Sequence, residues 1–216
     1  MKNWNPFRKI GKAPNQKTKP DEMEKDLVDG MGYKSCWAVV KGSSQQEIVE
    51  ALLQKDTEIY KYHEGLEKTE SAPYEDHVVF VTADFEGTNY IIGLAVNELF
   101  YDEDLLRQSF QSFPKAYLYM THRVSECHGF AMLEKGTITR LYRFDEEEIH
   151  SIGKPLEAEK KFGYNLPKSI DEMWDHWDDD TVTKMDEEII ITLALEQTRI
   201  DSEHYPYENV VVGSLK

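Results

Sequence analysis

The chain has few cysteines: Cys36 and Cys127 are the only two among its 216 residues. Both fall in segments that we predict to be strands, so we expect two reduced, buried thiols, as is typical of a cytosolic protein. His128 directly follows Cys127, but neighbours in sequence point to opposite faces of a strand. The adjacency therefore does not predict a Cys–His catalytic pair, because such a pair must meet in space.

Long apolar runs and recognised catalytic motifs are also missing. No run approaches the roughly 20 residues that cross a bilayer, and the N-terminal region lacks the apolar stretch of about 7–15 residues that a secretory signal needs. The sequence holds no Gly-rich phosphate loop, no Gly-x-Ser-x-Gly elbow and no His-Glu-x-x-His pattern. We therefore expect a cytoplasmic protein without a transmembrane segment, and we predict no cofactor and no metal.

Charge is distributed very unevenly along the chain. Residues 1–20 carry six basic side chains and no acidic one, whereas the whole chain has a net charge of −16, so residues 21–216 carry −22. An acidic body of this kind repels nucleic acid, whose binding depends on neutralising phosphates. It suits a basic protein partner, because opposite potentials accelerate association.

The composition and the pattern predict two regions. We expect residues 1–30 to be a basic, disordered tail and residues 31–216 to form a single domain. Trp4, Phe7 and Ile10 recur near helical spacing among basic residues, so weak contact of the tail with an anionic membrane surface is a further hypothesis.

Strand and helix signals alternate in groups along the body. Apolar, β-branched and aromatic runs predict strands at 33–41, 77–83, 90–96, 116–121, 124–133 and 137–144. Capping patterns predict helices after Ser44, Asp102, Ser169 and Thr183, and a short helix at 156–162 that stops at Gly163. For 189–195 a helix is favoured over a strand. The grouping predicts an α+β fold with an antiparallel sheet of about five or six strands and helices packed mainly on one side.

Several polar residues lie where the strand predicted at 116–121 ends and the strand predicted at 124–133 begins. If residues 122–128 formed one extended strand, His122, Glu126 and His128 would share a face and offer ligands for zinc, manganese or iron. The six-residue separation opposes this, because it places the Cα atoms of the two histidines about 20 Å apart. A polar solvent-facing hairpin with one buried histidine explains the same residues. A protein-binding surface is a third interpretation.

A second cluster combines acidic and aromatic side chains around the helix predicted after Ser169. Its members are Asp171, Glu172, Trp174, Asp175, Trp177, Asp178, Asp179 and Asp180. The triple aspartate falls near the end of the predicted helix, where negative charge opposes the macrodipole. The pattern lacks the glycine and terminal glutamate of an EF-hand. It indicates either a surface for a basic partner or a packed tryptophan pair beside a solvated acidic end.

Three stretches together resemble a loosely defined set of uncharacterised bacterial proteins. They are the opening Trp37-Ala-Val-Val-Lys-Gly42, the stretch from Thr121 to His128, and the aliphatic helix near 189–200. The chain is also similar in general style to small acidic immunity proteins. We therefore expect a bacterial protein-binding factor, of immunity or regulatory type, that uses the acidic cluster. The alternative is a metal-dependent hydrolase using Glu126 and His128, with His122 or His176 as a further ligand.

Overall fold

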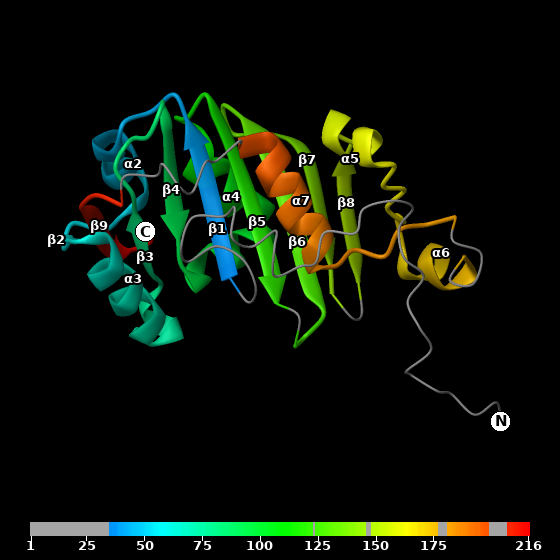
Figure 1. Ribbon diagram of the computed structural model, residues 1–216, viewed down its shortest axis with the longest axis horizontal. Helices are drawn as coiled ribbons and strands as arrows, with labels where there is room; N and C mark the ends of the chain where they lie inside the picture. The colour runs from blue at the N-terminus through cyan, green and yellow to red at the C-terminus, as the bar shows by residue number, and fades with distance from the viewer. Residues whose placement is uncertain (1–34, 123, 146–147, 177–180, 199–206) are drawn as a thin grey trace.

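The computed structural model describes residues 35–122, 124–145, 148–176, 181–198 and 207–216. The N-terminal tail predicted at 1–30, with its proposed membrane contact, lies outside the described residues. The described part forms one antiparallel sheet of nine strands with helices around it (Figure 1). The α+β class and the antiparallel sheet are confirmed, but the prediction of five or six strands is wrong.

The sheet runs in the order β2-β9-β3-β4-β1-β5-β6-β7-β8. Its strands are β1 (Ser35–Lys41), β2 (Glu58–Tyr60), β3 (Val78–Val81), β4 (Thr88–Ile92), β5 (Lys115–His122), β6 (Cys127–Glu134), β7 (Thr137–Phe144), β8 (Ile149–Gly153) and β9 (Val210–Ser214). The strands β5 to β8 follow one another as a meander, while β1 pairs with β4 and β5. The last strand, β9, returns to lie between β2 and β3.

Helices contribute to the cores on both faces of the sheet, so the prediction of helices mainly on one side is wrong. Trp37 and Val39 of β1 belong to one core, and the alternate residues Ala38 and Val40 belong to the other. The first core includes side chains of α3 (Tyr62–Ser71), α5 (Glu157–Phe162), α6 (Ile170–Asp175) and α7 (Glu187–Thr198). The second includes α2 (Gln45–Leu52), η3 (Leu94–Phe100) and α4 (Glu103–Phe110). A further short 3₁₀ turn, η2, spans Tyr74–Asp76. A strand that is apolar on both faces needs cover on both.

Local capping signals place most helix starts correctly. Ser44 forms the predicted capping box with Glu47, and Asp102 accepts a hydrogen bond from the backbone N–H of Leu105. Residues 187–198 are helical, as predicted, but Asp186 rather than Thr183 accepts from the first turn, through the N–H of Ile189. Each cap satisfies a backbone donor that the helix leaves unpaired.

Both cysteines are buried and free, as expected. Burial raises the pKa of each thiol, so neither is a ready nucleophile. Within the described residues, no helix combines the length and the apolar character needed to cross a bilayer.

Candidate functional site

The short helix α6 carries the described part of the acidic and aromatic cluster. Ser169 caps it by accepting a hydrogen bond from the N–H of Glu172, and the Glu172 carboxylate accepts from the N–H of Lys168. Met173 is buried and fixes the inner side of the helix against the sheet. Because Met173 is packed in the core, the opposite side of α6 faces solvent.

Three residues form the outward side of α6, and together they are called the α6 surface here: Asp171, Trp174 and Asp175. All three are exposed, and Trp174 keeps 53% of its surface accessible. Trp174 and Asp175 follow Asp171 by three and four residues, which makes them neighbours on a helix. Neither aspartate has an ion-pair partner among the described residues. Trp177, Asp178, Asp179 and Asp180 lie outside the described residues.

Asp175 is the last residue of α6. Negative charge there is unfavourable, because the last turn of a helix carries the negative end of its dipole. The charge of Asp175 therefore does not stabilise α6. Natural proteins break such local rules at functional sites, and this is why the α6 surface is considered as one.

The turn between β5 and β6 does not bring together the residues that the alternative interpretation offered as metal ligands. His122 pairs with Cys127 across the hairpin and His128 pairs with Thr121, so the two histidines project from opposite faces of the sheet. The expectation that His122, Glu126 and His128 share a face is wrong, because the chain turns between them instead of continuing as one strand. No group of three potential metal-ligating side chains occurs in the described parts of the chain.

Each of these polar residues has a local partner instead. His122 Nδ1 lies 2.7 Å from Ser125 Oγ, and His128 Nδ1 lies 3.1 Å from Thr121 Oγ1. Burial lowers the pKa of His128 to about 4, so its ring is neutral near pH 7. His128 is thus the buried histidine that the hairpin interpretation expected.

Glu126 connects the hairpin to the segment that precedes α7. Its carboxylate lies 3.2 Å from Lys184 Nζ. Asp186, two residues further along, caps α7, and burial raises the pKa of its carboxyl group. These contacts join β6 to the start of α7, which is a structural role.

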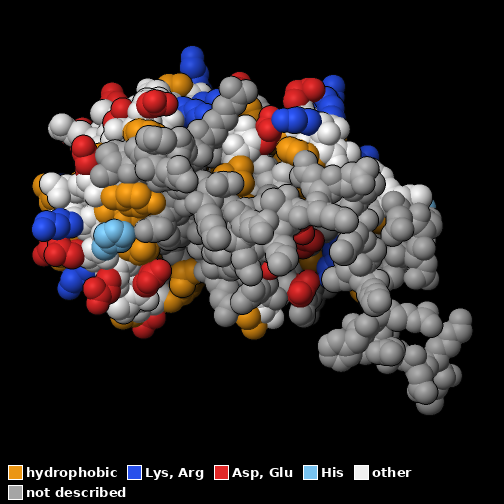
Figure 2. Space-filling view, viewed as in Figure 1, with side chains coloured by type: hydrophobic (Ala, Val, Ile, Leu, Met, Phe, Trp, Pro, Cys, Tyr) orange, Lys and Arg blue, Asp and Glu red, His pale blue; other side chains and the backbone are white. Residues whose placement is uncertain are grey.

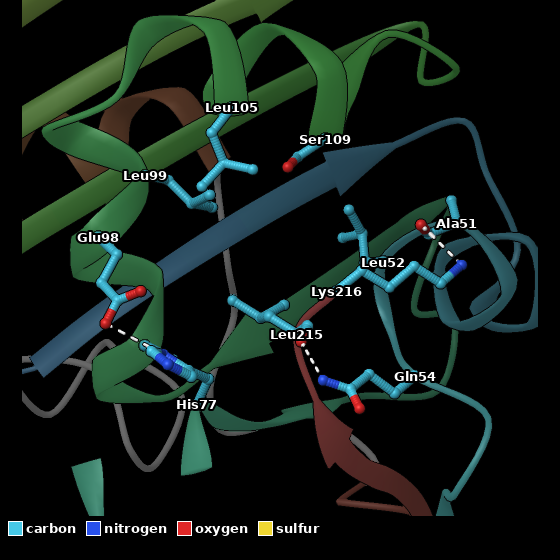
Figure 3. Close-up of a pocket in the computed structure, with 11 residues that line it drawn as sticks. Ala51, Leu52, Gln54, His77, Glu98, Leu99, Leu105, Ser109, Leu215 and Lys216 are labelled. Atoms are coloured by element: carbon cyan, nitrogen blue, oxygen red, sulfur yellow. Dashed lines mark hydrogen bonds and ion pairs between the residues drawn. The ribbon is translucent and has the colours of Figure 1, made fainter. Parts of the chain in front are cut away.

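A pocket that no sequence pattern predicts lies on the face of the sheet that α2, η3 and α4 cover (Figure 3). Its volume is about 260 Å³. Leucine and alanine side chains form much of its lining: Ala51, Leu52, Ala95, Leu99, Leu105 and Leu215. At one end, His77 Nδ1 lies 3.0 Å from Glu98 Oε1. These two residues are 21 positions apart and on different elements, so no motif could have predicted their pairing.

Comparisons with protein-family models, with curated proteins and with solved structures find no match to this chain. The resemblance to a set of bacterial proteins therefore stays a prediction. Any function has to be argued from the geometry of the chain itself.

Proposed function

We propose that this chain is a bacterial, cytoplasmic protein-binding factor of immunity or regulatory type, which captures a basic protein through the α6 surface. The exposed Trp174 between two exposed aspartates is the observation that carries the proposal. Large aromatic side chains are over-represented among the residues that dominate binding energy. Surrounding charges of one sign steer an oppositely charged partner and raise its association rate.

The overall charge supports the same interpretation. The chain has 41 acidic and 25 basic side chains, so its long-range field attracts basic proteins and repels nucleic acids. The similarity in style to acidic immunity proteins is a further premise, and it rests on analogy.

Affinity capture with matched variants tests the proposal. The bait is the full chain, and the test variant carries Asp171→Lys and Asp175→Lys. The control variant carries Glu67→Lys and Glu70→Lys on α3, where both glutamates are exposed and the net charge changes equally. Figure 2 shows acidic and basic side chains together at the α3 end of the molecule, so that end is a poor match for a basic partner.

We expect the wild-type chain and the α3 control to retain the same basic protein at low salt and to release it at high salt. The α6 variant should retain at least about tenfold less of the basic protein. A tenfold loss corresponds to about 1.4 kcal/mol of binding free energy. Equal retention by the two variants would exclude the α6 surface as the binding site.

The side chain of Trp174 is tested separately. Trp174→Ala should weaken capture by about 2 kcal/mol or more if the indole is an anchor. Ile59→Ala is the matched control, because Ile59 is 73% exposed and lies on β2, at the far edge of the sheet. Similar losses for both substitutions would contradict a specific role for Trp174.

A further inference from the structure

The pocket beneath α2 and α4 is built from several separate parts of the chain. Its apolar lining comes from α2, η3, α4 and the segment after β9, and much of that lining belongs to the buried core. An apolar cavity of about 150 Å³ is already large enough for benzene. This pocket, at about 260 Å³ and open to solvent at His77 and Glu98, therefore has room for a benzene-sized molecule that carries a substituent.

His77 is held at one end of this pocket in an unusual backbone conformation. Its φ of 51° and ψ of 36° are left-handed, a region that few residues other than glycine occupy, although histidine does so more often than most. Two backbone hydrogen bonds fix it there: its N–H donates to the carbonyl of Tyr74, and its carbonyl accepts from the N–H of Leu215. Such strained positions persist only where the surrounding structure enforces them, and they concentrate at functional sites.

The Glu98 carboxylate determines which nitrogen of His77 carries the proton. An ionised carboxylate can only accept hydrogen bonds, so Nδ1, at 3.0 Å from Glu98 Oε1, must donate. When the ring carries this single proton, Nε2 is left as an acceptor. Among the described residues no hydrogen bond to Nε2 is formed, and Figure 3 shows the imidazole between Glu98 and Leu215 at the edge of the pocket.

These features define the chemistry of a fitting ligand. The apolar lining favours an apolar body, and the acceptor at Nε2 favours a head group that donates a hydrogen bond. The carboxylate of Glu98 beside the ring disfavours an anionic head group at His77. The cation that also lines the pocket, Lys216, directs its Nζ to the backbone carbonyls of Glu50 and Ala51. Ser109 provides one further hydroxyl on the α4 wall, away from His77 (Figure 3).

We propose that this pocket binds a small, mainly apolar molecule with a hydroxyl group, such as a phenol or a short alcohol, whose O–H donates to His77 Nε2. The site is separate from the α6 surface, because Met173 of α6 packs into the core on the other face of the sheet. The two proposals can therefore fail independently.

Phenol is the probe for the first experiment, with the imidazole resonances of His77 followed by NMR in the full chain. We expect a saturable shift of these resonances. Toluene, which lacks the hydroxyl group, should bind about three- to tenfold more weakly, as the loss of one hydrogen bond predicts. Benzoate should bind more weakly than phenol because of Glu98. The absence of a saturable phenol shift would overturn the proposal, and so would equal or tighter binding of toluene or benzoate.

Two substitutions locate the site. Ser109→Phe should fill the pocket and abolish phenol binding, whereas Gln108→Phe, at an exposed neighbouring position outside the pocket, should leave binding unchanged. His77→Asn removes the imidazole acceptor but tolerates the left-handed backbone. Its binding is followed through the methyl resonances of Leu99 and Leu105, which line the pocket, and the substitution should weaken phenol binding without changing toluene binding. Retention of full phenol affinity by Ser109→Phe or by His77→Asn, with a folded spectrum, would refute the assignment.

Discussion

The pair formed by Arg140 and Glu159 yields the sharpest prediction about stability. Arg140 of β7 donates through Nε to Glu159 Oε2 at 3.0 Å and through Nη2 to Oε1 at 2.8 Å. Both side chains are almost fully buried, with 3% and 1% of their surface exposed. The guanidinium carbon also lies 5.6 Å from the centre of the Phe130 ring and 5.5 Å from that of Tyr142. Arg140 Nη1 also donates to Ser151 Oγ and to the carbonyl of Ile152, so the pair joins β7 to α5 and to β8 in the interior of the protein.

Removal of one charge should be costly, because the other charge remains buried without its counterpart. Glu159→Gln keeps the shape of the side chain but removes the charge, and we expect a loss of about 3–5 kcal/mol in the free energy of unfolding. The total for a domain is only about 5–15 kcal/mol, so the loss is large. Replacement of both residues, as in Arg140→Met with Glu159→Leu, should restore much of the stability, because no charge is left buried.

Urea unfolding followed by circular dichroism measures these differences. Glu157→Gln is the control on the same helix, because Glu157 pairs with Lys160 at a position where its side chain is 90% exposed. Exposed pairs contribute at most about 1 kcal/mol. A cost for Glu159→Gln no larger than that for Glu157→Gln would contradict this expectation, and so would a double variant as unstable as the sum of its single changes.

Three further predictions concern single positions. Gly153 has a φ of +80°, and a Cβ there would lie 2.1 Å from the carbonyl oxygen of Thr139, so Gly153→Ala should lower the urea midpoint markedly. Cys36 and Cys127 should react with a thiol reagent only as fast as the chain unfolds, and rapid modification of the native protein would contradict their burial. His128 has a folded pKa of about 4, below its ordinary value of 6.5. The unfolded chain therefore takes up the proton first, and stability should fall as the pH decreases from about 6.5 to 4, by up to about 3 kcal/mol. His128→Asn should flatten that dependence, and an unchanged pH profile would contradict it.

Local signals made much of the fold predictable. The caps at Ser44, Asp102 and Ser169 act over three residues, so the sequence around each one is sufficient to locate a helix start. The turn at Lys135 and Gly136 is equally local, and both residues adopt the left-handed conformation that such a hairpin needs.

Long-range pairing explains what the sequence could not show. The strand β9 lies between β2 and β3, which are more than 120 residues away along the chain. The residues of β9 alone do not indicate which strands it pairs with. The short strands β2 and β8 lie at the edges of the sheet, and their apolar residues are too few to predict a strand. The shared face considered for His122 and His128 as an alternative does not form for a related reason, since the chain reverses between them and the pairing places the two side chains on opposite faces.

Only the residue composition of the candidate site could be predicted from the sequence. The acidic and aromatic cluster is visible in the sequence, and the exposure of Trp174 depends on Met173 packing inward. The pairing of His77 with Glu98 depends on the sheet and on η3, so it becomes visible only in three dimensions.

The association rate between the chain and its captured basic partner tests the central claim most directly. Stopped-flow measurements at low and high ionic strength would compare the wild-type chain, the Asp171→Lys, Asp175→Lys variant and the α3 control. We expect the wild-type rate to fall steeply with salt, and the α6 variant to associate at least about tenfold more slowly at low salt. A rate that is independent of salt, or that is reduced equally by the α3 control, would contradict capture through the α6 surface.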